Sequence, residues 1–287
     1  MHNLFKNILI PVDFSINTEI AVKKGIELTE EDGVIHLLHV APLHFPVFGR
    51  ISFFNGHVPV SFDRYSSEAR LAQWTHAITA SFPGLAVKSH VVRGGNVQRE
   101  IARLAKKVGA AFIIIGKHNY HKWFNFLNTV FPNQLARSTG SAVLTLKTGS
   151  LHNRIRSIVM PVSNTGKNVP AYKLDLVVQL ARKYRARVYL VMLYYDAPEG
   201  TPNRYNGVIN AFRMLRGSLN NPIEYKVVSG PTLSKASMEF AYKVNADLIL
   251  LDAAGSLFPH VRVQETDRMR ADSKLEVLSV MNSEYSH

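Results

Sequence analysis

The chain has 287 residues, of which 34 are Lys or Arg and 21 are Asp or Glu, and it contains no cysteine. The lack of cysteine excludes disulfides, thiol catalysis and thiolate metal sites, and no apolar run reaches the ~18 residues that a membrane helix needs. The net charge of +13 favours anionic partners, although both halves of the chain share the cations. Because the N-terminus shows no signal-peptide pattern, we expect a cytoplasmic protein without a membrane partner.

Short apolar segments alternate with amphipathic segments through the first half of the chain. Strands are predicted at residues 7–12, 34–40, 87–92, 111–116 and 142–146. The segments at 7–12 and 111–116 are apolar throughout, which is typical of parallel strands covered on both faces. An apolar stripe with helical spacing predicts a helix at 97–108.

The second half repeats this order of features. Pro11 in the first strand corresponds to Pro161, and a second amphipathic helix is predicted at 233–244. Gly109 follows the first helix and Asn245 follows the second, at equivalent positions. Glycine and asparagine are the residues that most readily take the left-handed conformation that ends a helix, so the repeat extends to a shared backbone requirement.

The alternation of strands and helices predicts the fold class. We expect an α/β fold of two tandem, doubly wound, parallel five-stranded sheets, with right-handed crossovers and helices on both faces. The expected domains cover residues 1–148 and 153–284. In such sheets, ligands bind beyond the carboxyl ends of the strands, at the point where the strand order reverses.

Polar residues follow two strands of the first domain. Asp13 comes directly after the first strand, where its carboxylate can accept a hydrogen bond from a ribose hydroxyl or a base amine. The fourth strand leads into Gly116-Lys117-His118-Asn119, a loop that can present backbone N–H groups to phosphates. These two strand ends are therefore the candidate site.

Three segments carry a family resemblance: Pro11-Val12-Asp13-Phe14-Ser15, Leu37-Leu38-His39-Val40 and Ile113-Ile114-Ile115-Gly116. In their order and spacing, the chain resembles the universal stress protein family, over essentially its whole length and in a tandem form. The resemblance implies the adenine-nucleotide-hydrolase-like fold of this family, with strand order 3-2-1-4-5. It also implies ATP or AMP between the first and fourth strands, as in the members that bind it.

The resemblance further implies site residues in the first domain. Nucleotide-binding members carry Gly-x-x-Gly, nine residues, and then Gly-Ser or Gly-Thr after the fourth strand. Gly116 matches the first glycine, Asn119 and Asn128 replace the other two with one residue fewer between them, and Thr129 stands where the hydroxyl belongs. Backbone at 116–119 and 128–130 would hold phosphates, Asp13 the ribose or adenine, and Val40 backbone the adenine edge. The full expected set is Pro11, Val12, Asp13, Val40, Gly116, His118, Asn119, Asn128, Thr129 and Val130.

The second domain departs further from this pattern. Ser163 stands in the place of Asp13, and Asp252 stands in the place of Gly116. A carboxylate at Asp252 would repel a close phosphate by about 1 to 4 kcal/mol. We therefore expect no nucleotide in the second domain, which would pair with the first domain as a fixed partner within one chain.

The candidate residues also have structural alternatives. Asp13 could serve only as a cap of the helix that starts near Asn17, although Asn17 is itself the better-placed cap. Gly116 could serve only a tight strand exit. His118 and His121 lie three residues apart without a carboxylate near them in sequence, so we expect no metal beyond Mg²⁺ accompanying ATP.

Two further features lie beside the expected site. His36 and His39 lie three residues apart on one strand, so they face opposite sides of the sheet and cannot form one site. The segment at 42–65 is a long, aromatic-rich loop, and such a loop within a compact domain is usually functional or mobile. Covering the pocket and packing against the second domain are both open roles for it.

The chain carries no nucleophile elbow, no P-loop and no zinc-protease motif. We therefore expect a stress-response sensor or adaptor that binds an adenine nucleotide, or a related small anion, in the first domain without catalysis. Two alternatives stay open: a nucleotide-free stress-response interaction protein and a weak ATP-hydrolysing enzyme. An unidentified protein partner is expected and a homodimer is open, whereas nucleic acid is not expected because no basic stripe interleaved with aromatic residues occurs.

Overall fold

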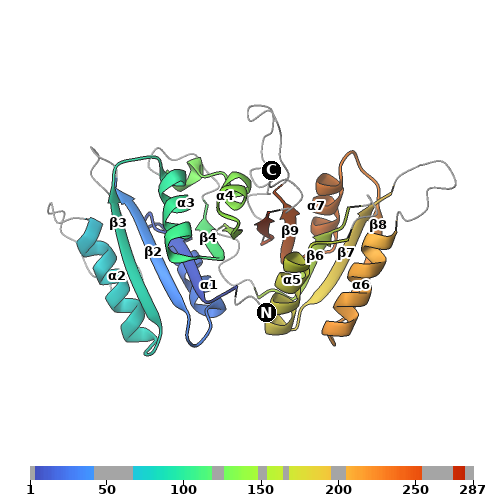
Figure 1. Cartoon of the computed structure of the whole chain (residues 1–287), viewed down its shortest axis with the longest axis horizontal. Helices are drawn as coiled ribbons and strands as arrows, with labels where there is room; N and C mark the ends of the chain where they lie inside the picture. Colours follow the sequence, from blue (N-terminus) through green and yellow to red (C-terminus); the bar gives the residue numbers. More distant parts are fainter. Residues whose placement is uncertain are drawn as a thin grey trace. The chain divides into compact units, whose positions relative to one another are not determined.

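The computed structural model describes residues 4–41, 67–117, 126–147, 154–163, 168–194, 205–253 and 274–281. The chain divides into two compact units, which we call the N-terminal unit, His2–Leu151, and the C-terminal unit, His152–His287 (Figure 1). Among the described helices, none is long and apolar enough to cross a membrane.

The N-terminal unit alternates strands and helices, as its apolar pattern predicts. Its strands are β1 (Asn7–Pro11), β2 (Val34–Ala41), β3 (Ala86–Arg93), β4 (Phe112–Gly116) and β5 (Ala142–Leu146). Its helices are α1 (Ile16–Leu28), α2 (Ser67–Ser81), α3 (Val97–Val108) and α4 (Pro132–Thr139), with a 3₁₀ turn, η1 (Phe126–Thr129). The strands are parallel and pair in the order β3-β2-β1-β4-β5.

The C-terminal unit repeats this arrangement. Its strands are β6 (Ser157–Pro161), β7 (Arg187–Leu193), β8 (Ile223–Val228), β9 (Leu248–Asp252) and β10 (Glu276–Val280). Its described helices are α5 (Ala171–Tyr184), α6 (Asn206–Ser218) and α7 (Leu233–Lys243). The parallel order β8-β7-β6-β9-β10 is again 3-2-1-4-5, which confirms the predicted fold class.

The core explains why the central strands are apolar. Every residue of β4 and β5 is buried, whereas the outer strand β3 has no fully buried residue. In the N-terminal unit, α1 packs on β1 and β4 and α2 packs on β2 and β3, while α3 and α4 pack together. Right-handed crossovers place the first pair of helices on one face of the sheet and the second pair on the other.

The two helices that carry equivalent end residues close in the same way. Gly109 has φ 63° and Asn245 has φ 53°, as predicted for both positions. The next residue of each chain segment reaches back to the last turn: Ala110 N–H donates to Ala105 O at 2.9 Å, and Ala246 N–H donates to Ala241 O at 2.8 Å. These bonds satisfy carbonyl groups that a helix end would otherwise leave without a partner.

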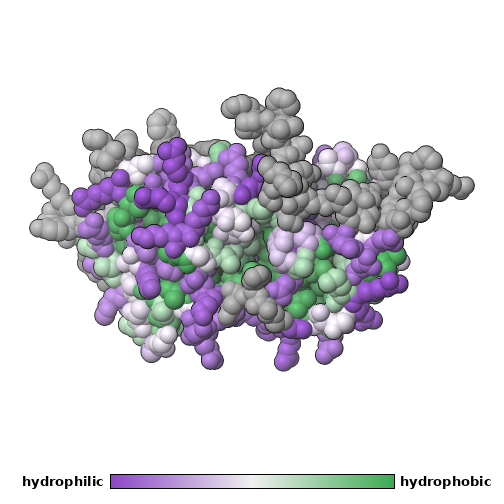
Figure 2. Space-filling model, viewed as in Figure 1, coloured by the Kyte–Doolittle hydropathy of each residue, from purple (hydrophilic) through white to green (hydrophobic). Residues whose placement is uncertain are grey.

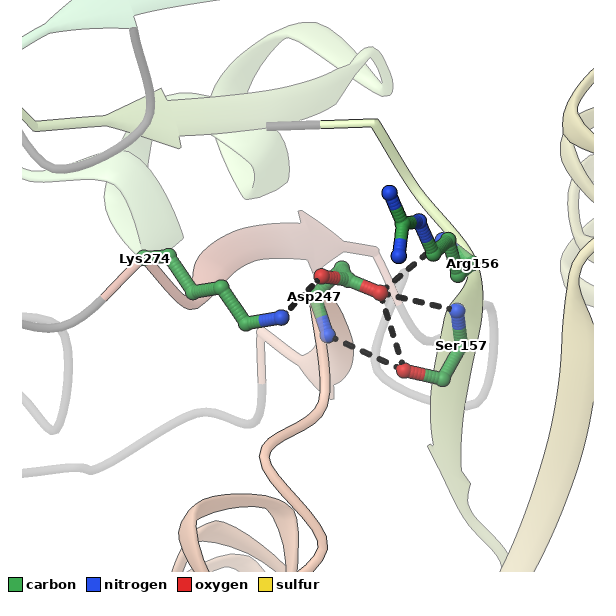
Figure 3. A network of polar contacts seen from close by, with 4 residues as sticks. All are labelled: Arg156, Ser157, Asp247 and Lys274. Carbon is green, nitrogen blue, oxygen red and sulfur yellow. Dashed lines mark hydrogen bonds and ion pairs between the residues drawn. The ribbon is translucent and has the colours of Figure 1, made fainter. Parts of the chain in front are cut away.

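A polar network ties together the amino ends of β6, β9 and β10 in the C-terminal unit (Figure 3). Asp247 Oδ2 accepts from the backbone N–H groups of Arg156 and Ser157 at 2.9 and 3.0 Å, and from Ser157 Oγ at 3.0 Å. Its other oxygen, Oδ1, accepts from Lys274 Nζ at 2.6 Å. The buried Asp247 carboxylate is thus a structural junction, and it lies at the opposite end of the strands from the predicted ligand edge.

Candidate functional site

The candidate site lies where the strand order of the N-terminal unit reverses, at the carboxyl ends of β1 and β4. β1 pairs with β2 on one side and with β4 on the other. Pro11 ends β1, and Val12 continues it, buried, with its N–H donating to Leu38 O at 2.7 Å. His39 Nδ1 lies 2.7 Å from Val12 O and must carry the proton, since a carbonyl oxygen only accepts. These two hydrogen bonds therefore hold Val12, which directly follows β1, against β2.

Asp13 lies next in the chain and is part of a compact hydrogen-bond network at the start of α1. Its Oδ1 accepts from Ser15 N–H at 3.1 Å, and also from the hydroxyl groups of Ser15 and Thr18. The N-cap of α1 is Ser15, whose side chain accepts from Thr18 N–H. Asp13 thus supports the cap from outside the helix.

The expectation that Asn17 caps this helix is wrong. Asn17 is fully buried within the first turn of α1, and its Nδ2 donates to Lys117 O at 3.0 Å. Lys117 directly follows β4, and its N–H donates to Leu146 O of β5 at 2.8 Å. Asn17 therefore joins the start of α1 to the exit of β4.

Gly116 shows why this junction is so close. A Cβ atom built at Gly116 would overlap the backbone carbonyl of Asn17. Only glycine lets the first turn of α1 approach the last residue of β4 at this distance. Packing between α1 and β4 therefore explains Gly116. This explanation agrees with the alternative that Gly116 serves only a tight exit from the strand.

Val40 lies near the end of β2, and its backbone direction follows from its neighbours. Leu38 O faces β1, because it accepts from Val12 N–H, and Ala41 O faces β3, because it accepts from Gly94 N–H at 2.7 Å. Successive residues of a strand direct their backbone groups to alternate sides. The backbone of Val40 therefore faces the end of β1, on the side where the resemblance places a base.

The second expected phosphate segment is described in part. Asn128 and Thr129 belong to η1, Thr129 is exposed, and Val130 is fully buried with its N–H donating to Leu127 O at 3.2 Å. The side chain of Asn128 lies outside the described residues, as do His118, His121 and Asn119. The segment at 42–65 is also outside them, so its two open roles stay predictions.

An aromatic and cationic cluster beside Asp13 was not predicted. Phe14 has φ 59°, an unusual conformation for a bulky residue. Its ring lies 4.7 Å from the His39 ring and 5.4 Å from Trp74, and the guanidinium carbon of Arg70 lies 4.3 Å from its centre. Arg70 and Trp74 belong to α2, so only tertiary packing brings them to the exit of β1. The cluster holds Phe14 turned inward while Asp13 turns toward α1.

His36 and His39 lie on opposite faces of β2, as predicted, and have different partners. His36 Nδ1 lies 3.1 Å from His90 Nε2 on β3, with the two rings stacked. Burial, followed by the nearby His90 and Lys88, lowers the pKa of His36 to about 4. Burial also lowers the pKa of His39. Both imidazoles are therefore neutral at pH 7.

The equivalent edge of the C-terminal unit is built with charged groups. Asp252 ends β9, where β4 ends with Gly116, and Lys173 Nζ donates to Asp252 Oδ1 at 2.7 Å and to Pro161 O at 3.1 Å. When Lys173 is aligned with Asn17, every buried position of α5 matches a buried position of α1, and only the buried Glu19 of α1 lacks a buried counterpart. The buried residue that bonds the first turn of the helix to a strand exit is thus Asn17, an amide, in the N-terminal unit and Lys173, an ammonium, in the C-terminal unit.

Comparisons with known proteins agree with this fold. The model of the universal stress protein family matches residues 4–147. Universal stress protein G of Escherichia coli O157:H7 is 34% identical over 123 residues, covering 40% of this chain and 81% of that protein, and its Shigella flexneri counterpart gives the same values. The crystal structure of a universal stress protein from Archaeoglobus fulgidus DSM 4304 has a TM-score of 0.62 at 15% identity and covers 97% of both chains. That structure shows the fold alone, but over both units, whereas the family model and the sequence relatives show descent: this chain belongs to the universal stress protein family.

Proposed function

We propose that the N-terminal unit binds an adenine nucleotide, ATP or AMP, at the carboxyl ends of β1 and β4, and that the protein acts as a stress-response sensor or adaptor without catalysis. The observation that carries this proposal is the meeting of both strand exits at the first turn of α1. Asp13 bonds to Thr18 in this turn, and Gly116 packs against its neighbour Asn17. The carboxylate and the glycine-lined strand exit therefore border one place at the edge of the sheet.

The chemistry of this edge suits a nucleotide. The backbone of Val40 offers one donor and one acceptor, which is the pattern that the edge of an adenine base requires. The N-terminus of α1 and the backbone of 128–130 supply N–H groups of the kind that bind phosphate. Lys117 and Lys147, which directly follow β4 and β5, are buried and bring positive charge to the same ends of the strands.

We expect Mg²⁺ to be bound together with the nucleotide. The described residues contain no group of three or more His, Asp or Glu side chains that could hold a metal ion. Mg²⁺ is commonly bound through the phosphates of its ligand with few protein groups. A requirement for Mg²⁺ should accordingly appear with ATP and be weaker with AMP.

One observation favours the second candidate, a nucleotide-free interaction protein. Asp13 Oδ1 already accepts from three donors at the start of α1, and Gly116 is required for the packing of α1. Both residues would therefore be kept by a chain that had lost its ligand. Weak ATP hydrolysis on the same fold is a third candidate, and its test is included below.

The test is mass spectrometry of nucleotides released from the natively purified chain, together with thermal unfolding in millimolar ATP or AMP. We expect about one adenine nucleotide per chain and a rise in melting temperature that Asp13→Asn abolishes. Asp32→Asn is the matched control, because Asp32 pairs with Lys6 on the exposed surface of the same unit. No bound nucleotide and no rise in melting temperature would establish the nucleotide-free candidate. Steady release of ADP that Asp13→Asn abolishes would establish the enzyme.

A further inference from the structure

The first turn of α5 holds a buried cation in an unfavourable place. Lys173 is the third residue of α5, and its side chain is only 3% exposed. The N-terminus of a helix carries partial positive charge, so a lysine there is repelled and an anion is attracted. The N-cap of α5 is Pro170, which makes no side-chain capping bond among the described residues. By contrast, α1 begins with the Ser15 cap and has Glu19 in its first turn.

Asp252 supplies the anion that this place attracts. Its carboxylate lies 2.7 Å from Lys173 Nζ and is 29% exposed, so the ion pair is closed on the side of the helix and open on the side of the strand end. Burial and the Asp252 carboxylate together raise the pKa of Tyr172, which precedes Lys173 in the same turn. The Asp252 carboxylate therefore lies beside the first turn of α5.

The Asp252 carboxylate has no counterpart at the equivalent position of the N-terminal unit. Position 252 corresponds to Gly116, and Lys173 corresponds to Asn17, which bonds there to a backbone carbonyl. The cation and the anion thus occur together in one unit and are absent together from the equivalent positions of the other.

We infer that the carboxyl edge of the C-terminal unit is an anion-binding site that the chain itself occupies: the Asp252 carboxylate binds Lys173 and the first turn of α5 where a phosphate group would otherwise bind. The inference does not depend on nucleotide binding by the N-terminal unit. It also gives Asp252 a role beyond repulsion, because a tethered carboxylate competes at a far higher effective concentration than a free ligand.

Removing the carboxylate should open the site. In Asp252→Asn, the Lys173 ammonium stays buried at a helix N-terminus without its counter-charge, which is the situation that a free anion relieves. The probe is inorganic pyrophosphate, and the readout is hydrogen–deuterium exchange in the full-length chain at peptides from 168–184 and 248–253. At a pyrophosphate concentration about ten times Kd, we expect about tenfold slower exchange in these peptides of the variant.

Two comparisons make this result specific. The wild-type chain should show no change in these peptides, and neither should the double variant Lys173→Met/Asp252→Asn, which lacks both charges. Asp32→Asn is a surface control, because it frees Lys6, whose side chain is 52% exposed and lies away from any buried pair. Peptides of the N-terminal unit report any nucleotide site separately, so failure there leaves this test intact.

The inference is overturned if pyrophosphate leaves Asp252→Asn unchanged, if it protects the double variant equally, or if it protects the wild-type chain to the same extent. Should Asp252→Asn fail to fold, its refolding is followed with pyrophosphate and with sodium chloride at equal ionic strength. Recovery with pyrophosphate alone supports the inference, and recovery with both or with neither overturns it.

Discussion

The two units have the same strand order but hold their first helix against the strand exits by different means. In the N-terminal unit, Asn17 uses a neutral amide to reach Lys117 O, and Gly116 allows the close approach. In the C-terminal unit, Lys173 reaches both Pro161 O and the Asp252 carboxylate. One packing requirement is thus met by a neutral amide in the N-terminal unit, where we propose that the edge binds an anion, and by an ion pair in the C-terminal unit, where we infer that the edge is already occupied.

The two units agree at their helix ends and differ at their strand exits. The helix ends at Gly109 and Asn245 keep the same left-handed geometry in both units, since every copy of the fold must turn there. The strand exits keep no such common geometry, because Asn17 and Gly116 of the N-terminal unit correspond to Lys173 and Asp252 of the C-terminal unit. Changes at the exits should therefore have unequal effects in the two units.

The largest effect is expected at Gly116. Gly116→Ala places a Cβ atom against the backbone of Asn17, which cannot move without shifting α1, so we expect a loss of about 3 kcal/mol in the free energy of unfolding. Urea unfolding with hydrogen–deuterium exchange assigns the loss to the N-terminal unit. The control is Gly217→Ala in α6, where no atom lies near the added methyl group, and which should be neutral or stabilising. Equal stability of both variants would contradict the close approach.

The next effect concerns the charged exit. Asp252→Ala removes the partner of a buried ammonium and should destabilise the C-terminal unit by about 2 kcal/mol. Asp32→Ala breaks an ion pair with a similar distance, 2.9 Å, but with both side chains exposed to solvent, and should destabilise the chain much less than Asp252→Ala does. Both variants are measured by urea unfolding at low and high salt. Equal losses in the free energy of unfolding for the two substitutions would contradict the greater importance of the buried ion pair.

A third difference appears on acidification. Because the pKa of His36 is lowered to about 4 in the folded state, the unfolded chain binds the proton more readily. The N-terminal unit is therefore fully stable above about pH 6.5 and loses roughly 1 to 2 kcal/mol as the pH falls toward 4. The described residues of the C-terminal unit contain no histidine. Exchange measured between pH 7 and 4 should show earlier loosening of β2 and β3, and His36→Phe should reduce it. Loosening that is unchanged in His36→Phe would exclude His36 as its main cause.

The smallest effect on stability is expected at Asp13. Asp13→Ala removes the carboxylate that supports the cap of α1, at a cost of about 1 kcal/mol. Thr232→Ala removes the N-cap bond of α7 to Lys235 N–H and should cost a similar amount. Thermal unfolding compares the two losses, and calorimetric titration with ATP separates their roles, because only Asp13→Ala should weaken binding. Weakening by both would assign the effect to general destabilisation.

Local backbone requirements could be predicted from the sequence. The burial of β1 and β4 and the two helix ends follow from apolar spacing and from residues that tolerate positive φ. The strand order within each unit follows from the resemblance to the universal stress protein family. The divergence of the second site was also visible, since Asp252 stands in place of Gly116.

Partners far apart in the sequence could not be predicted. Ser15 and Asn17 are both good caps, and the choice between them depends on Lys117, which lies 100 residues from Asn17. Lys173 and Asp252 are 79 residues apart, and only the burial pattern of α5 places the lysine opposite the strand exit. Phe14 pairs with Arg70 and Trp74 only through the packing of α2.

The most direct test of the difference between the units is hydrogen–deuterium exchange of the full-length chain with and without saturating ATP and Mg²⁺. We predict slower exchange at the exit of β1 and the first turn of α1, at peptides covering 11–20, and no change at 168–184 or 248–253. Protection of both units, or of the C-terminal unit alone, would contradict the assignment of an open edge to one unit and an internally occupied edge to the other.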